Sequence, residues 1–239
     1  MTQVLPGRAI LPEAMTNTVR SLVAYGLAGG VAWSVIRQCR KPTGWLGRLM
    51  VGIMNRSHSD LTAWGLEHVK IGSRDTVLDV GCGGGRTVHR LASLANLGKA
   101  HGVDYSEASV AVSRGLNKVA IEAGRVAIQK ASVSQLPFPN DQFDLVTAVE
   151  THYYWPDRPA DLREIHRVLK PGGRLLIIAE TYRGSRFDML QRSAMKLIGG
   201  SHLSADEHRE LLAQAGYADV QVFFEPKKGW ICVSGRKAV

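Results

Sequence analysis

The chain has 239 residues, of which 45% are hydrophobic and 21% are charged, with 25 glycines. This ordinary composition excludes a disordered, collagen-like or low-complexity protein. The net charge of +9 is uneven, since residues 1–72 hold 8 basic and 3 acidic side chains (+5) and residues 73–239 hold 22 and 18 (+4). Any attraction to anionic surfaces is therefore expected in the first third of the chain.

The cysteines Cys39, Cys82 and Cys232 are widely spaced and odd in number. This spacing offers neither a disulfide framework nor a zinc ribbon, and we expect no metal site. The first apolar run begins near Ser21 without a convincing cleavage site after it, so no secretory signal is expected. A reducing cytoplasm is the simplest setting.

The N-terminal third contains an uncharged run of 16 residues, Ser21 to Ile36, with basic residues on both sides. It is shorter than the roughly 20 residues that a membrane span needs. Three alternatives stay open: a buried or lid helix, an interfacial helix that makes residues 21–41 a peripheral membrane contact, and a true span. After a break at residues 42–44, apolar residues at helical spacing predict helices over 45–54 and 58–69. We expect residues 1–72 to be a helical extension or lid.

From Asp75 onward, short apolar runs alternate with amphipathic stretches, which is typical of a parallel sheet covered by helices. The last two predicted strands are separated by a turn too short for a helix, so they should form an antiparallel hairpin. Residues 73–239 are therefore expected to form one α/β domain. The predicted strands are 76–80, 100–103, 126–130, 143–149, 174–180, 220–224 and 230–234, and the predicted helices are 85–95, 107–123, 158–169 and 205–215.

A glycine-rich turn follows the first predicted strand, in Val77-Leu78-Asp79-Val80-Gly81-Cys82-Gly83-Gly84-Gly85. Glycines here permit a sharp turn and close backbone approach to a ligand, although a tight strand-to-helix turn needs glycine even without one. The dinucleotide fingerprint is disfavoured, because Arg86 occupies its third glycine position. Asp79 suits a cationic group such as an amino-acid ammonium. Asp104 ends the second strand 23 residues after Gly81, where an acid can accept both hydroxyls of a ribose or cap the next helix.

Four motifs in order resemble the class I S-adenosylmethionine-dependent methyltransferases of the type 11 group. The resemblance is strong over residues 72–180 and architectural over 181–239, and it implies a Rossmann-like seven-stranded sheet that ends in an antiparallel hairpin. The four motifs are Val77–Gly85, the ribose-type acid Asp104, Leu136-Pro137-Phe138-Pro139 with Phe143-Asp144, and Arg167-Val168-Leu169-Lys170-Pro171-Gly172-Gly173.

The resemblance implies S-adenosylmethionine as the cofactor. Ser132 departs from the family, which usually has an aspartate there for the adenine amino group, so we expect weaker cofactor affinity. Glu150 falls where the family borders the methionine chain and the reacting methyl. The residues that the resemblance assigns to the cofactor are Asp79, Gly81, Cys82, Gly83, Asp104, Tyr105, Ser132, Val133 and Glu150.

The segment after the fourth predicted strand contains the candidates for catalysis. His152 has the pKa of a base at neutral pH, and packing is the alternative. Tyr153, with Tyr154 and Trp155, is a candidate wall for an apolar or aromatic acceptor, with core packing as an equal alternative. Weaker candidates, for which surface or capping roles are the alternative, are Tyr182, His202 and His58.

The expected function is methyl transfer, by in-line displacement, to a small apolar or aromatic acceptor. Too few cysteines lie near the cofactor for arsenite methylation, and the motifs of DNA base methylation are absent from the sequence. The basic residues are scattered, so no specific nucleic acid is expected as a partner. Two alternatives stay open: methylation of a lipid or quinone at a membrane surface, and cofactor binding without transfer.

Overall fold

The computed structural model describes residue 38 and residues 41–239, apart from the side chains of residues 53, 55 and 56. The described residues belong to Ile36–Val239, one of the two units into which the chain divides. The run from Ser21 to Ile36, with its three alternatives, lies outside the described residues.

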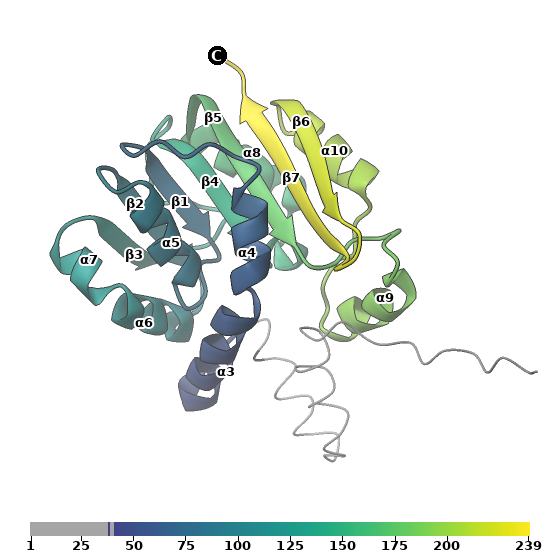
Figure 1. The fold of residues 1–239 in the computed structure, drawn as a ribbon, viewed down its shortest axis with the longest axis horizontal. Helices are drawn as coiled ribbons and strands as arrows, with labels where there is room; N and C mark the ends of the chain where they lie inside the picture. The colour runs from purple at the N-terminus through teal and green to yellow at the C-terminus, as the bar shows by residue number, and fades with distance from the viewer. Residues whose placement is uncertain (1–37, 39–40) are drawn as a thin grey trace, which may run out of the picture. The chain divides into compact units, whose positions relative to one another are not determined.

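A seven-stranded sheet with the order β3-β2-β1-β4-β5-β7-β6 forms the centre of this unit (Figure 1). Neighbouring strands from β3 to β5 are parallel, and β7 is antiparallel to both β5 and β6. The predicted mostly parallel sheet with a C-terminal hairpin is therefore confirmed. The strands are β1 (Thr76–Val80), β2 (Lys99–Asp104), β3 (Val126–Lys130), β4 (Phe143–Val149), β5 (Leu169–Ala179), β6 (Tyr217–Glu225) and β7 (Trp230–Lys237).

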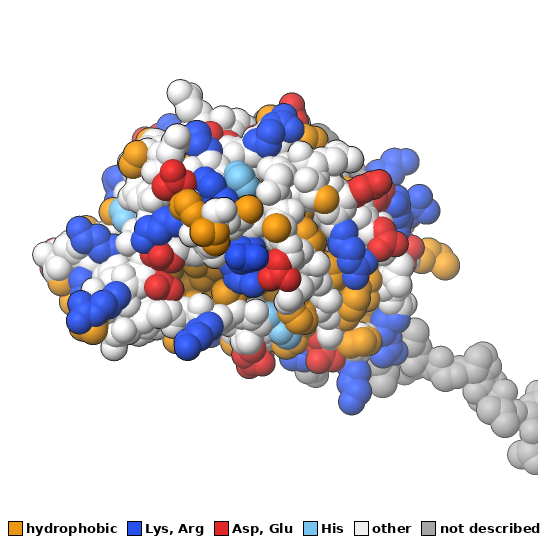
Figure 2. All heavy atoms as spheres, turned by 90° about the horizontal axis from the view of Figure 1, so that it is seen from above, with side chains coloured by type: hydrophobic (Ala, Val, Ile, Leu, Met, Phe, Trp, Pro, Cys, Tyr) orange, Lys and Arg blue, Asp and Glu red, His pale blue; other side chains and the backbone are white. Residues whose placement is uncertain are grey.

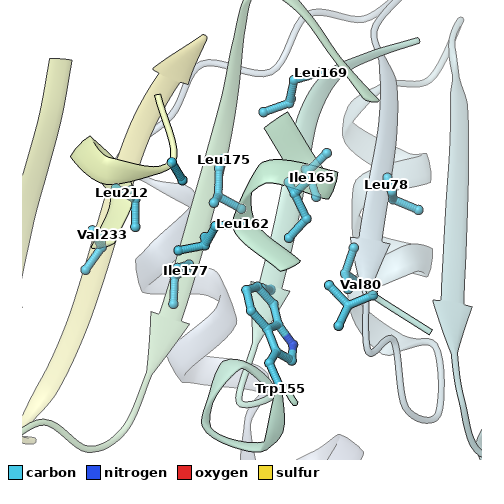
Figure 3. Close-up of a cluster of buried hydrophobic side chains, with 14 of the residues drawn as sticks. Leu78, Val80, Trp155, Leu162, Ile165, Leu169, Leu175, Ile177, Leu212 and Val233 are labelled. Atoms are coloured by element: carbon cyan, nitrogen blue, oxygen red, sulfur yellow. The ribbon is translucent and has the colours of Figure 1, made fainter. Parts of the chain in front are cut away.

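Helices cover both faces of the sheet, as the alternating pattern requires (Figure 1). One face carries α4 (Ser59–Leu66), α5 (Arg86–Leu94) and α6 (Glu107–Leu116), and the other carries α8 (Arg158–Val168) and α10 (Ala205–Gln214). Figure 3 shows the second core, in which Leu162 and Ile165 of α8 meet Leu175 and Ile177 of β5. All four side chains are at most 2% exposed, so burial of apolar surface holds these layers together.

Three helices begin at side chains that accept a hydrogen bond from the first turn. Ser106 caps α6, Asp157 caps α8, and Ser204 with Glu207 forms a capping box at the start of α10. Each such cap contributes on the order of 1 kcal/mol. These caps place the helix starts within a residue of the predicted ones.

The largest differences from the sequence prediction concern three elements. The predicted helix 107–123 is split at Asn117, whose buried side-chain amide donates to the carbonyls of Gly85 and Ser113, and α7 (Lys118–Glu122) follows. β5 begins five residues before the predicted start, because Phe143 pairs with Leu169 and a bulge carries the intervening chain to the next pair. The helix α9 (Asp188–Leu197) was not predicted, and no side chain caps its start.

The described part of the N-terminal extension packs in the same unit as the sheet. It forms α3 (Gly44–Ser57) and α4, and α3 contacts α6 near the edge at which the parallel strands end (Figure 1). The Ser106 hydroxyl donates to the Pro42 carbonyl at 2.6 Å, which fixes the chain before α3 against the loop after β2. The division into domains 1–72 and 73–239 stays a prediction.

Candidate active site

A cavity of about 370 Å³ opens at the carboxyl ends of the parallel strands, around the point where the strand order reverses between β1 and β4. Its volume is in the range of small-molecule sites. All nine residues predicted to bind the cofactor line it, namely Asp79, Gly81, Cys82, Gly83, Asp104, Tyr105, Ser132, Val133 and Glu150. The structure thus brings together residues that are up to 71 positions apart in the sequence.

The glycine-rich turn after β1 forms one wall of the cavity. Gly81 has φ +72°, and a Cβ at this position would overlap the Thr151 side chain, so only glycine fits. The backbone N–H groups of Gly81 and Cys82 both donate to the Val103 carbonyl, at 2.8 and 2.9 Å, which ties the turn to β2. This arrangement leaves the chain around Gly83 open to the cavity, since nothing lies within 4 Å of a Cβ placed there.

Asp104 is 7% exposed and is held by two backbone groups. The Gly83 N–H donates to one carboxylate oxygen at 2.9 Å, and the Ser106 N–H donates to the other at 2.8 Å. Burial raises the pKa of Asp104, and the two N–H groups oppose this. Each oxygen of a carboxylate can accept a second hydrogen bond, so Asp104 can still receive two hydroxyls of a ribose.

Asp79 is 2% exposed and accepts a hydrogen bond from the Thr147 hydroxyl at 2.6 Å. Burial raises the pKa of Asp79 to about 7, and nearby Asp104 adds to this rise. Among the described residues, no Lys or Arg forms an ion pair with Asp79. A buried carboxylate without a cation fits an ammonium group from a ligand.

The other predicted cofactor contacts lie on the β2–α6 and β3–β4 connections. Tyr105 is 40% exposed, and the Lys41 ammonium lies 5.7 Å from the centre of its ring. The Ser132 hydroxyl accepts from the Ser134 N–H at 3.2 Å, and Val133 is buried beside it. Burial raises the pKa of Cys82 well above its usual value, so this cysteine is a neutral packing group in the cavity wall.

Glu150 follows β4 with φ +56°, a backbone conformation that is uncommon outside glycine. Its Oε1 accepts from the Tyr153 hydroxyl at 2.7 Å and from the Glu180 backbone N–H at 2.6 Å. Burial, with the neighbouring Glu180 carboxylate, raises the pKa of Glu150 well above its usual value. The structure thus holds one half-buried carboxyl group in a fixed position on the cavity wall.

The two residues predicted to take part in catalysis do not line this cavity. His152 is 2% exposed, and its Nε2 lies 3.0 Å from Nε2 of His208 on α10. Burial lowers the pKa of His152 well below 6.5. Tyr153 is 5% exposed and holds Glu150. Catalysis by His152 stays a prediction, and its position favours the packing alternative.

Of the three weaker candidates for catalysis, one lines the cavity and two do not. His58 lies at the start of α4 and lines the cavity. His202 lies 2.9 Å from the Thr181 hydroxyl, and Tyr182 packs against Phe224, and neither lines the cavity.

The sequence missed several residues of the cavity wall, which come from α3 to α5. Val51, Met54 and Thr62 line it, and Arg90 of α5 reaches the Ser59 carbonyl at 2.9 Å. The predicted helix 45–54 contains both Val51 and Met54, and their three-residue spacing indicates that they lie on one face of that helix.

On the face shown in Figure 2, Lys and Arg side chains are interspersed with acidic and apolar ones rather than gathered in one patch.

A family model described as a methyltransferase domain matches residues 78–177. This range contains the glycine-rich turn, Asp104 and Glu150. Over these residues the chain is similar to the type 11 group of the class I S-adenosylmethionine-dependent methyltransferases.

The curated relatives of this chain are similar to it mainly over the same region. The 27-O-demethylrifamycin SV methyltransferase of Amycolatopsis mediterranei (strain S699) is 38% identical over 103 residues, which are 43% of this chain and 38% of that protein. An uncharacterized methyltransferase of Bacillus subtilis (strain 168) is 24% identical over 77% of this chain and 96% of its own length. The chain spans about half or less of the curated relatives that it matches at 30% identity or more.

The fold is shared with solved methyltransferase structures. A solved S-adenosylmethionine-dependent methyltransferase from Aquifex aeolicus has a TM-score of 0.65, with 22% identity over 79% of this chain and 97% of that one. The part of the chain that the structure describes contains no helix long and apolar enough to cross a membrane.

Proposed function

We propose that this chain transfers a methyl group from S-adenosylmethionine to a small acceptor with an apolar or aromatic body. The observation that carries the proposal is the convergence of all nine predicted cofactor residues on one cavity. These residues come from four separate strand ends and loops, and the cavity that they share has a size suited to a small molecule.

The polar side chains of the cavity fit the polar groups of this cofactor. Asp104 would hold the ribose hydroxyls through its two remaining acceptor positions, and Asp79 would receive the amino-acid ammonium. Ser132 and the backbone of Val133 would border the adenine. When bound, the cofactor supplies a methyl group on a sulfonium, which is displaced in line by a nucleophile.

The acceptor would lie between the loop after β4 and the N-terminal helices. Val51 and Met54 of α3 provide apolar surface there, and Tyr154 and Trp155 provide aromatic surface. These side chains exclude water and orient the acceptor, which is most of what methyl transfer from a sulfonium requires of the protein.

The test is binding of the demethylated product, S-adenosylhomocysteine, measured by calorimetry. The wild-type chain should bind it at one site. Asp104→Asn should bind it at least about tenfold more weakly, because one acceptor oxygen becomes a donor. Asp206→Asn is the matched control, since Asp206 is exposed on α10. Folded wild-type protein that takes up neither cofactor nor product would refute the proposal, and an unchanged affinity in Asp104→Asn would place the ribose elsewhere.

A further inference from the structure

Two carboxyl groups lie close together at the cavity, with Glu150 in its wall and Glu180 next to Glu150. Glu150 follows β4 and Glu180 follows β5, the neighbouring parallel strand. The Tyr153 hydroxyl and the Glu180 N–H both donate to Oε1 of Glu150, which leaves Oε2 for other contacts. Within the described part of the chain, no Lys or Arg forms an ion pair with either carboxylate. Adjacent carboxylates without a cation repel each other, and a positively charged ligand would relieve the repulsion.

His58 adds a third group from a distant part of the chain. One ring nitrogen of His58 and one oxygen each of Glu150 and Glu180 lie within 4.8 Å of one another. A neutral imidazole nitrogen and two carboxylate oxygens are all hydrogen-bond acceptors. The three side chains therefore form a cluster that can receive several N–H donors of a single ligand group.

We propose that His58, Glu150 and Glu180 bind the amino group of the methyl acceptor, which is a primary or secondary amine. This inference rests on the proposed function and names the substrate class of that same site. Tyr154 and Trp155 line the same cavity, and aromatic faces attract an ammonium. Val51 and Met54 would contact the apolar body of the amine.

Charge distinguishes an amine from a hydroxyl acceptor. A hydroxyl becomes negative as it loses its proton, and two carboxylates beside it would oppose that change. An amine is positive both before it loses a proton and after it has gained a methyl group. The same two carboxylates stabilise both of these states.

An ammonium and a metal ion place different requirements on the spacing of these groups. Three acceptors placed about 2.9 Å from a tetrahedral nitrogen lie about 4.7 Å from one another. Ligand atoms at the 2.0 to 2.2 Å typical of zinc would lie about 3.5 Å apart in a tetrahedral site. The three groups lie within 4.8 Å of one another, a limit that accommodates either ligand, so uptake of a metal ion is one outcome of the test below.

The reaction balances with these groups alone. The bound ammonium gives one proton to the Glu150 carboxylate or the His58 imidazole and becomes a neutral amine. The amine nitrogen then forms the new N–C bond while the C–S bond of the sulfonium breaks, and the electron pair of that bond stays on sulfur. The methylated nitrogen is positively charged beside Glu150 and Glu180.

The test compares two probes of equal shape, 2-phenylethylamine and 2-phenylethanol, by calorimetry on the full chain saturated with S-adenosylhomocysteine. The amine should bind at least about tenfold more tightly than the alcohol, and Glu180→Gln should remove most of this preference while leaving the alcohol unchanged. The backbone N–H of residue 180 can still donate to Glu150 in this variant, because the substitution changes only the side chain. His58→Gln is the second variant, and Glu210→Gln, on the exposed side of α10, is the matched control.

Product binding is measured first, which separates the two proposals. If the wild-type protein does not bind S-adenosylhomocysteine, the proposed function itself is refuted. With that binding intact, equal affinity for both probes, no affinity for either up to about 10 mM, or an amine preference that survives both substitutions would overturn the amine site. Uptake of Mn²⁺ by the wild type but not by Glu180→Gln would also overturn it, in favour of a metal site.

Discussion

Replacing Asp79 by asparagine should stabilise the ligand-free protein and weaken cofactor binding. Asp79 is buried, with the Thr147 hydroxyl as its hydrogen-bond partner. Burial raises the pKa of Asp79 from 3.8 to about 7. Each tenfold change in proton affinity corresponds to about 1.4 kcal/mol, so the ionised carboxylate costs the folded state about 4 kcal/mol above pH 7.

The pH dependence follows from the sign of this shift. Between pH 3.8 and 7 the folded protein binds more protons at Asp79 than the unfolded chain does, so Asp79 makes the wild type less stable as pH rises through this range. Asparagine has no such dependence, but its amide leaves a donor unpaired at a cost of about 1 kcal/mol. The variant should therefore be more stable than the wild type by about 3 kcal/mol at pH 8.5, and by about 0.5 kcal/mol at pH 5.

Urea unfolding without cofactor, at pH 5 and pH 8.5, measures this difference. Calorimetry with S-adenosylhomocysteine at pH 8.5 should show at least about a tenfold loss of affinity, because the ammonium loses its charged partner. Asp206→Asn, at an exposed position, should change neither quantity. A stability difference that is the same at both pH values would refute the argument that burial of the Asp79 charge is responsible.

Two further predictions follow from the positions of single residues. Gly81→Ala should destabilise the protein by about 1 to 3 kcal/mol in urea unfolding and abolish binding of S-adenosylhomocysteine, because the added Cβ would overlap Thr151. Gly83→Ala should cost only about 1 kcal/mol, because Gly83 has φ +50° but open space around it. Equal costs at the two glycines would contradict this. His152 and His208 have their pKa lowered by burial, so their contribution to stability is present above pH 6.5 and is lost as pH falls below it. His152→Gln should lose less unfolding free energy than the wild type between pH 6.5 and 5 and should bind S-adenosylhomocysteine normally; an identical pH profile would assign the acid sensitivity to other groups.

The convergence of the predicted cofactor residues on one cavity was predictable because these residues lie at or near strand ends. Asp79, Asp104 and Glu150 end or follow parallel strands, and the carboxyl ends of parallel strands meet at one edge of the sheet. The sheet and its hairpin were predictable for a similar reason, since apolar runs and short turns are local signals. The start of β5 was not, because the bulge around Gly173 depends on close contact with the Phe143 carbonyl on another strand.

The sequence pattern did not predict the direction in which the side chains after β4 point. His152 was expected at the mouth of the site, but the short helix η1 (His152–Tyr154) turns its ring toward His208, which is 56 residues away. The same turn directs the Tyr153 hydroxyl to Glu150. His58, by contrast, reaches the cavity only because α3 and α4 pack in the same unit as the sheet, and no local signal in the sequence predicts this packing.

The acidic groups of the cavity contrast with the net charge of +9 of the whole chain. Asp79, Asp104 and Glu150 line the cavity, with Glu180 beside them, while Arg86 and Arg90 approach from α5. Under the proposed function, Asp79 and Asp104 bind the cofactor. Of these four acidic residues, Glu150 and Glu180 are then the two that can interact with a charge on the acceptor. Transfer to an amine moves the positive charge from sulfur to nitrogen beside these two carboxylates, whereas transfer to a hydroxyl removes a positive charge from the cavity as a proton. Because two adjacent, partly buried carboxylates repel each other without a cation, the pair favours the reaction that keeps the positive charge next to it.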